Sequence, residues 1–340
     1  MRVLIRFPNW LGDAVLALPA LRAARRHFAS AALAVAAPPS VAPLLSEGIG
    51  VEDVETIVLP DERRAQAQVL AAGRFDVAVL LTNSFGSAWV ARSAGIGERW
   101  GYRSDCRGPL LTRAVRKPRA RVHQADYYRG LVAGLGMAHD AEPPAVSVGE
   151  ATRARARARL ADAGWNGSPP LIGLAPGAAY GHAKRWPPAR TAALVARLAA
   201  TRGASCVLVG APEDRDAARA VESSLAGRDV GTRLIDLVGH TDLRVAMGVL
   251  AHCQAFVTND SGAMHLAAAI GLPVIAIFGP TDERVTAPVG AHEVLAARVF
   301  CRPCMLRECP IDHRCMKRIT PEMVDDAVGR QLDRAPEPRA

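Results

Sequence analysis

The sequence predicts an α/β protein made of two domains, each a parallel sheet wrapped by helices. Short apolar runs alternate with helical stretches, and this alternation stops in the middle of the chain and then starts again. A chain of 340 residues is long enough for two cores of ordinary size. Half of the residues are hydrophobic and 22% are charged, a globular composition without the signature of disorder.

The first half opens with an apolar strand, the loop FPNWLGD and a long helix, and the same succession then repeats. The expected strands are 2–6, 32–35, 56–59 and 77–81, and the expected helices are 14–27, 63–72 and 87–94. In the middle, ATRARARARL (151–160) places an arginine at every second position, which on a helix scatters them around the axis. We therefore expect an exposed helix there and not a nucleic-acid-binding arm.

The run GWNGSPP after this helix is a probable linker, so the boundary is predicted to separate domains 1–165 and 166–340. The expected strands of the second half are 171–174, 206–209, 234–236, 255–258 and 273–278, and its helices are 189–200, 217–225, 244–251 and 262–270. A last helix begins at Thr320-Pro321-Glu322 and could cross back to the first domain. No GxGxxG follows a first strand in either half, which disfavours a dinucleotide-dependent dehydrogenase.

The charge balance suggests an anionic partner, because 42 Lys and Arg against 33 Asp and Glu give a net charge of +9. A solvated arginine-rich surface is the alternative. Few aromatic residues interleave with the basic stretch 98–129, so nucleic acid is not expected as a partner. Arg6 and Asp13 interrupt the apolar N-terminus, which argues against a secretory signal, and seven cysteines then suggest reduced thiols in the cytoplasm.

The run FVTNDSGAMHL is predicted to contain the end of a strand, an open turn and the start of a helix. The backbone N–H groups of Ser261 and Gly262 would be free at the helix start, where the helix dipole favours an anion. Asp260 could cap the helix or accept a ligand hydroxyl, and His265 lies one turn further on the same face. The alternative is a plain helix cap followed by a core histidine.

The loop APGAAYGHAKRW is a second candidate anion site. Gly177 and Gly181 would keep it open, while Lys184 and Arg185 bring cations to it. The alternative is a surface loop whose Trp186 packs on the next helix.

Asp13, after the first strand, is a candidate general base that could take a proton from an attacking hydroxyl. The alternative is that it only caps a helix N-terminus.

The run CRPCMLRECPIDHRC carries Cys301, Cys304, Cys309 and Cys315, which could hold a metal. Free thiols in a packed loop are the favoured interpretation, because the spacing of the cysteines fits no single zinc finger.

Taken together, FPNWLGD, TNSFGSAWVARSAGIGERWGYR, APGAAYGHAKRW, NDSGAMHLAAA, FGPT and CRPCMLRECPIDHRCM resemble the ADP-heptose glycosyltransferase family, from Met1 to about Val328. The resemblance implies a GT-B fold with two Rossmann-like domains, the donor on the C-terminal one and the acceptor on the N-terminal one. It implies inverting, metal-independent transfer of L-glycero-D-manno-heptose from ADP-heptose to the first heptose of the lipopolysaccharide inner core. The acceptor would be the anionic lipid A–Kdo–heptose, met at the cytoplasmic face of the inner membrane by a peripheral enzyme.

The resemblance also implies residue roles: Asp13 as the base and Lys184 offsetting charge on the leaving diphosphate. The implied donor-binding residues are Gly177, Ala178, Ala179, Glu213, Asp260, Ser261, Gly262 and His265. The implied acceptor-binding residues are Arg63, Arg64, Arg103 and Arg107. A glutamate found in many relatives is replaced at Arg244 or Val245, which leaves nucleoside contacts there undefined.

Three alternatives stay open at this point: a nucleotide-sugar epimerase on the same fold, a heptosyltransferase that serves another core position, and a binding protein that clamps a ligand between two domains. The basic acceptor half disfavours an epimerase, because such an enzyme has no lipid acceptor to hold. Consumption of ADP-heptose only in the presence of lipid acceptor would separate the first alternative from a transferase.

Overall fold

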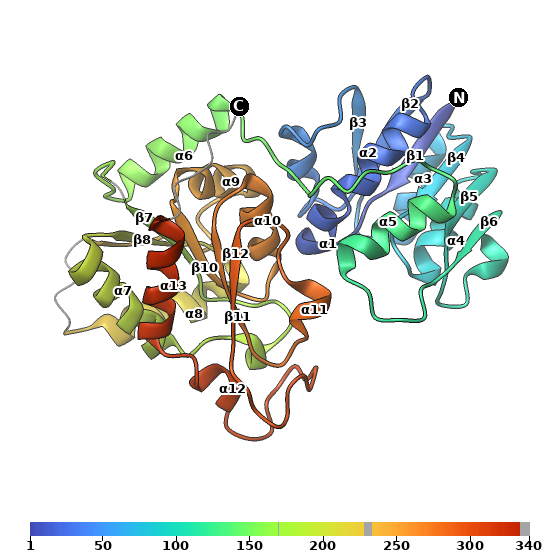
Figure 1. Cartoon of the computed structure of the whole chain (residues 1–340). Helices are drawn as coiled ribbons and strands as arrows, with labels where there is room; N and C mark the ends of the chain where they lie inside the picture. The colour runs from blue at the N-terminus through green and yellow to red at the C-terminus, as the bar shows by residue number, and fades with distance from the viewer. Residues whose placement is uncertain (169, 228–232, 334–340) are drawn as a thin grey trace. The chain divides into compact units, whose positions relative to one another are not determined.

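The computed structural model describes residues 1–168, 170–227 and 233–333, and the chain divides into two compact units, Met1–Ser147 and Val148–Ala340. Each unit contains a six-stranded sheet, and every strand pairing within both sheets is parallel (Figure 1). The predicted α/β class with two parallel-sheet domains is therefore confirmed.

The first unit has the strand order β3-β2-β1-β4-β5-β6. Its strands are β1 (Arg2–Arg6), β2 (Ala32–Ala37), β3 (Val54–Val58), β4 (Val77–Leu80), β5 (Glu98–Arg103) and β6 (Arg113–Arg116). Its helices are α1 (Leu11–Leu16), α2 (Leu18–His27), α3 (Arg63–Ala72), α4 (Phe85–Ser93) and α5 (Gln124–Gly134), with short 3₁₀ turns η1 (Ala42–Ser46) and η2 (Gly108–Leu110). The order reverses between β1 and β4, so the loops after these two strands lie at the switch point where α/β proteins bind ligands.

The first helix, two strands and the unpredicted helix α5 of this unit differ from the sequence prediction. The expected helix 14–27 begins earlier and is split at Ala17, because Pro19 stands at the start of α2 and has no N–H to continue α1. Strands β5 (ERWGYR) and β6 (RAVR) were not predicted, since their charged residues hide the apolar pattern. Strand β6 is the edge strand of the sheet, and β5 lies between β4 and β6.

The second unit has the strand order β12-β11-β10-β7-β8-β9. Its strands are β7 (Leu171–Ala175), β8 (Ser205–Leu208), β9 (Leu234–Asp236), β10 (Ala255–Asn259), β11 (Val274–Phe278) and β12 (His292–Ala296). Its helices are α6 (Glu150–Asp162), α7 (Pro188–Arg202), α8 (Arg215–Leu225), α9 (Leu243–His252), α10 (Gly262–Ile270), α11 (Glu283–Thr286), α12 (Arg314–Lys317) and α13 (Pro321–Asp333), with 3₁₀ turns η3 (His182–Lys184) and η4 (Pro212–Asp214).

The central strands of this sheet explain why its loops are held in fixed places. Every residue of β7, β10 and β11 is buried, on both faces of the sheet, as expected for parallel strands covered by helices on both sides. The order again reverses between β7 and β10, which are direct neighbours. The glycine-rich loop after β7 and the NDSG turn after β10 therefore leave the sheet side by side.

The division between the units lies before α6, whereas the sequence analysis placed it after this helix. Helix α6 packs on α9, where an added Cβ at Gly248 would stand 2.5 Å from the Cβ of Ala156. The imidazole Nε2 of His252 also lies 3.0 Å from the carbonyl oxygen of Arg153. The arginine-rich helix is exposed on its other side, as predicted.

Helix α13 belongs to the second unit. It packs on α7 and on strands β10 to β12. Its buried Asp325 accepts hydrogen bonds from Arg197 (2.7 Å) and Arg202 (2.8 Å), both on α7. Among the described residues, no helix combines the length and the apolar character needed to span a bilayer.

Replacing Asp325 by alanine should destabilise the chain by about 2 to 3 kcal/mol, because two partly buried guanidinium groups lose their common partner. Urea unfolding measures this change. Asp326→Ala, one residue along and exposed, is the control and should change stability by no more than about 0.5 kcal/mol. Equal effects of both substitutions would contradict a role for Asp325 in holding α13.

Candidate active site

Asn259, the last residue of β10, ties the glycine-rich loop to the NDSG turn. Its side chain is buried, and its Nδ2 donates to the carbonyl oxygens of Pro176 and Gly177, both at 3.1 Å. Its Oδ1 accepts a hydrogen bond from the backbone N–H of Trp186 at 3.0 Å. One side chain thus holds both ends of the loop 176–186. The sequence analysis did not assign Asn259, although it is the first letter of the NDSG tetrad.

Asp260 and Lys184 form the ion pair at this point. The Lys184 ammonium lies 2.6 Å from Asp260 Oδ2, and the Thr281 hydroxyl donates to the same oxygen at 2.7 Å. The ammonium also stands 4.6 Å from the centre of the Tyr180 ring, a cation–π contact. Three loops, after β7, β10 and β11, therefore meet at one carboxylate, which neither caps the helix nor stands open to a ligand hydroxyl.

The N-terminus of α10 has no side-chain cap. Ser261 is the N-cap residue, with extended backbone, and its hydroxyl lies 3.2 Å from that of Thr258 instead of turning to the helix. Ser261, Gly262 and Ala263 are partly exposed. The first-turn N–H groups and the helix dipole can therefore act on an anion beside the Lys184 ammonium.

His265 lies one turn into α10 and is buried, with 6% of its surface exposed. This position agrees with the core-histidine alternative. Of the two alanines of the glycine-rich loop, Ala178 is buried and Ala179 is exposed, so a ligand can reach the backbone at 179 without meeting a large side chain.

Position 177 has no room for a side chain, because the Asp214 carboxylate lies against it. A Cβ at position 177 would stand 1.9 Å from Asp214 Oδ1, so any side chain there would displace one of the two. Burial raises the pKa of Asp214 above its ordinary value, and the backbone N–H of Ala211 and the Arg185 guanidinium oppose this rise. The predicted donor residue Glu213 is exposed, and it is the adjacent Asp214 that touches the loop. Glu213 and Asp214 are adjacent in the sequence, and the resemblance could not show which of the two lies against the loop.

The cysteine-rich segment, which we define as residues 297–318, supports the glycine-rich loop from outside. The carbonyl oxygen of Arg307 accepts the N–H of Ala183 at 2.9 Å, and that of Met305 accepts the Tyr180 hydroxyl at 2.8 Å. Gly181 has a φ of 154°, and a Cβ there would stand 2.4 Å from the Arg307 carbonyl oxygen, so glycine is needed for this contact. Among the described residues, no group of three or more His, Cys, Asp or Glu side chains is arranged to hold a metal ion.

In the first unit, Asp13 is the third residue of α1 and not its cap, because the N-cap residue is Trp10. The helix-cap alternative is therefore wrong. Gln124 Nε2 donates to Asp13 Oδ1 at 2.8 Å, and the Tyr128 hydroxyl lies 3.3 Å from the same oxygen. No hydrogen-bond partner of Oδ2 is found in the described part of the chain, which leaves this oxygen available to a proton donor.

The surroundings of Asp13 act on its pKa in opposite directions. Burial raises the pKa above its ordinary value, while the hydrogen bonds from Gln124 and Tyr128 favour the carboxylate and limit the rise. Such a carboxylate is more basic than an exposed one, as suits a general base. Neither Gln124 nor Tyr128 was recognised in the sequence, because they are far from Asp13 along the chain and only the packing of α5 beside α1 brings them near.

The four arginines predicted to bind an acceptor differ in their surroundings. Arg107 is fully buried, and it donates to the carbonyl oxygens of Tyr102 (2.9 Å) and Thr82 (2.5 Å), so it serves the fold and cannot meet an acceptor; this assignment was wrong. Arg63 and Arg64 are exposed, and the Arg63 guanidinium lies against Gly86 in the first turn of α4. Arg103 is also exposed and lies against Gly108.

The site of the second unit, with an uncapped helix N-terminus, a glycine-rich loop and a lysine, is typical of enzymes that transfer a group from a nucleotide diphosphate on an α/β scaffold. A solved structure of the ADP-heptose lipopolysaccharide heptosyltransferase II of E. coli is similar over 98% of both chains, with a TM-score of 0.84 and 29% identity. This similarity confirms the GT-B glycosyltransferase fold.

Sequence comparison defines the family more closely. Lipopolysaccharide heptosyltransferase 2 of Salmonella typhimurium is 32% identical over 88% of each chain. The Escherichia coli protein of the same name is 31% identical over 98% of this chain and 99% of its own. Residues 63–314 match the model of glycosyltransferase family 9 (heptosyltransferase). The chain belongs to this family and is a glycosyltransferase.

Asn259→Asp should destabilise the second unit by about 2 to 4 kcal/mol, because it replaces a donor by a carboxylate oxygen that faces backbone carbonyls. Asn259→Ala should cost a similar amount through the unpaired groups that it leaves. Urea unfolding followed by circular dichroism measures both. Wild-type stability of Asn259→Asp would show that this side chain does not organise the loop.

Asp13→Asn should raise the melting temperature at neutral pH. Because burial raises the pKa of Asp13, the folded chain binds a proton there more readily than the unfolded chain does, and stability falls as pH rises from the ordinary carboxyl pKa through the raised one. Asparagine keeps an oxygen for Gln124 and Tyr128 but carries no charge. The gain should vanish in acid below the ordinary carboxyl pKa, and Asp61→Asn, at an exposed site, should give no gain at either pH.

Proposed function

We propose that this chain transfers L-glycero-D-manno-heptose from ADP-heptose to the first heptose of the lipopolysaccharide inner core, with inversion at the anomeric carbon. Its family and its relatives named lipopolysaccharide heptosyltransferase 2 support this activity. The observation that carries the proposal is the Lys184–Asp260 ion pair beside the uncapped N-terminus of α10, which together provide a site for a diphosphate.

On the donor side, the diphosphate would lie against the N–H groups of Ser261 and Gly262 and near the Lys184 ammonium. When the bond between the anomeric carbon and the diphosphate oxygen breaks, negative charge grows on the leaving group. The ammonium and the helix dipole stabilise this charge without moving, because Asp260 and the Tyr180 ring already fix the position of Lys184. The open backbone at Ala179 and Asp214 beside Gly177 would meet the nucleoside part.

On the acceptor side, Asp13 would take the proton from the attacking sugar hydroxyl. Oδ1 is held by Gln124 and Tyr128, so Oδ2 is the oxygen that receives the proton. As the proton leaves, the hydroxyl oxygen forms the new bond to the anomeric carbon on the face opposite the diphosphate, which inverts the configuration. The exposed Arg63, Arg64 and Arg103 would bind anionic groups of the acceptor.

We propose that the reaction needs no metal ion. Lys184 and the amide groups of α10 supply positive charge where a divalent cation would otherwise be required. The Asp260 carboxylate is occupied by Lys184 and Thr281. Turnover in excess chelator should therefore equal turnover with added magnesium.

We propose further that the enzyme works at the cytoplasmic face of the inner membrane as a peripheral protein. Its acceptor would be a lipid anchored there and bearing anionic groups. The first unit supports this location with a run of exposed cations that no acid interrupts: Arg113, Arg116, Lys117, Arg119 and Arg121.

The particular acceptor is tested directly by supplying ADP-heptose together with core acceptors that carry no heptose, one heptose or two heptoses. Transfer only to the acceptor with one heptose supports the proposal. Transfer to either of the others would assign another core position, and consumption of ADP-heptose without any acceptor would favour an epimerase.

Asp13→Ala should lower kcat by roughly two to four orders of magnitude with little change in ADP affinity, because the base acts only in the chemical step. The variant loses one hydrogen-bonded carboxylate of the first unit and no group of the diphosphate site. Single-turnover kinetics and ADP titration calorimetry measure the two quantities. A matching loss of ADP affinity would exclude Asp13 as a base that acts only on the acceptor.

A further inference from the structure

The cysteine-rich segment presents an unusual amount of apolar surface to solvent. Eleven large hydrophobic side chains are exposed in the described part of the chain, and four of them lie in the twelve-residue stretch 300–311 of this segment. They are Phe300 (79% exposed), Met305 (45%), Leu306 (44%) and Ile311 (49%). Exposed apolar side chains that gather in this way mark a surface that another phase or molecule covers.

This exposure belongs to an ordered segment, because its backbone is fixed to the body of the second unit at several points. The Met305 N–H donates to the Pro280 carbonyl oxygen at 2.9 Å, and Arg302 Nε donates to that of Gly279 at 2.6 Å. At its C-terminal end, Cys315 and Met316 are part of the hydrophobic core. The four apolar side chains are thus held outward on a fixed support.

Cations alternate with these apolar residues. The segment carries six basic residues and two acidic ones, Glu308 and Asp312, and the exposed cations among them are Arg298, Arg307, Lys317 and Arg318. Phe300 stands between Arg298 and Arg302 in the sequence, and the Arg314 guanidinium lies 5.1 Å from the centre of its ring. An anionic bilayer surface binds segments in which exposed apolar and cationic side chains are interspersed, with the apolar groups among the acyl chains and the cations at the phosphates.

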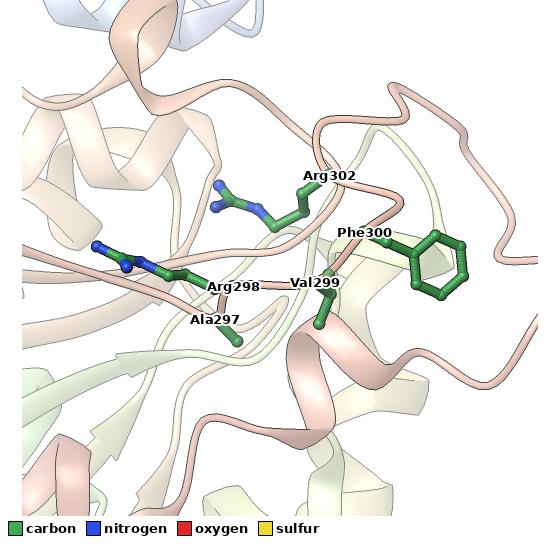
Figure 2. A pocket seen from close by; sticks show the side chains of 5 residues that line it. All are labelled: Ala297, Arg298, Val299, Phe300 and Arg302. Carbon is green, nitrogen blue, oxygen red and sulfur yellow. The ribbon is translucent and has the colours of Figure 1, made fainter.

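A hollow beside Phe300 adds to this arrangement. It has a volume of 440 Å³ and is lined by Ala297, Arg298, Val299, Phe300 and Arg302 (Figure 2). In this view the guanidinium groups of Arg298 and Arg302 extend to one side and the Phe300 ring to the other. Arg302 is paired with Glu283 at 2.6 Å, so the exposed Arg298 is the cation that a phosphate-bearing headgroup beside an inserted Phe300 ring would meet.

We propose that the cysteine-rich segment is the surface by which the second unit binds an anionic phospholipid bilayer. This bilayer surface adds to the proposed function. It rests on that function in one respect, because a lipid-anchored acceptor requires the enzyme to work at a bilayer. Because the backbone of Met305 and Arg307 holds Tyr180 and Ala183, the same segment links the bilayer contact to the loop that carries Lys184.

Co-sedimentation of the full chain with vesicles tests this inference. Wild type should bind vesicles of phosphatidylethanolamine and phosphatidylglycerol, and should bind vesicles of phosphatidylcholine alone weakly. The double variant Phe300→Ser/Leu306→Ser should bind the anionic vesicles at least about tenfold more weakly, because two exposed apolar groups lose their transfer into the interface. Arg298→Gln/Lys317→Gln should weaken binding by about tenfold at low salt and remove much of its salt dependence.

Met323→Ser is the matched control, since Met323 is 41% exposed on α13 of the same unit and outside the segment. It should bind vesicles as wild type does, and circular dichroism should show all variants folded. Wild-type vesicle binding by the Phe300→Ser/Leu306→Ser variant, equal binding of wild type to both kinds of vesicle, or no binding of wild type to either would each overturn the inference. The last result is also the one expected if the segment binds another protein.

Transfer to a deacylated, water-soluble acceptor separates this inference from the proposed function. The variants should retain wild-type kcat on that acceptor and lose rate only on acceptor embedded in vesicles. Transfer by wild type without vesicle binding would refute the bilayer surface alone. Vesicle binding without transfer to either acceptor would refute the proposed function alone.

Discussion

The side chains of Asn259 and Asp260 fix the geometry of the loops at the carboxyl end of the second sheet. Asn259 holds the two ends of the glycine-rich loop, and Asp260 draws the Lys184 ammonium and the Thr281 hydroxyl to one oxygen. Both are buried at the end of a strand with no exposed residue, so their hydrogen bonds are protected from water. The N-terminus of α10 has no side-chain cap, which leaves its first-turn N–H groups to an anion.

The first unit holds Asp13, the proposed base, by a similar arrangement. Asp13 lies just after the loop that follows β1, at the switch point of the first sheet, and α5 supplies the two groups that hold one of its oxygens. In each unit a carboxylate near the carboxyl end of a central strand is held by groups from other parts of the chain. Asp260 is neutralised by Lys184, which suits it to hold that cation in place. Asp13 is only hydrogen bonded, which suits it to accept a proton.

The sequence was sufficient to predict the two parallel sheets and the NDSG and glycine-rich loops, since buried central strands read as continuous apolar runs and glycines mark open turns. It was insufficient where position depends on packing. Nothing in the sequence distinguishes Arg107 from Arg103, yet Arg107 is buried and Arg103 is exposed. Gln124 and Tyr128 have no local motif, and Asp214 differs from Glu213 only by which side chain turns toward Gly177. Strands β5 and β6 were missed because charged residues interrupt their apolar pattern.

The central claim is that Lys184, held by Asp260, neutralises a diphosphate at the start of α10. Titration calorimetry of ADP into Lys184→Met, compared with wild type under the same conditions, tests it most directly. The account predicts that ADP affinity falls by at least about tenfold, since one charge-assisted contact to phosphate is lost. Unchanged affinity, in a variant that circular dichroism shows to be folded, would contradict it.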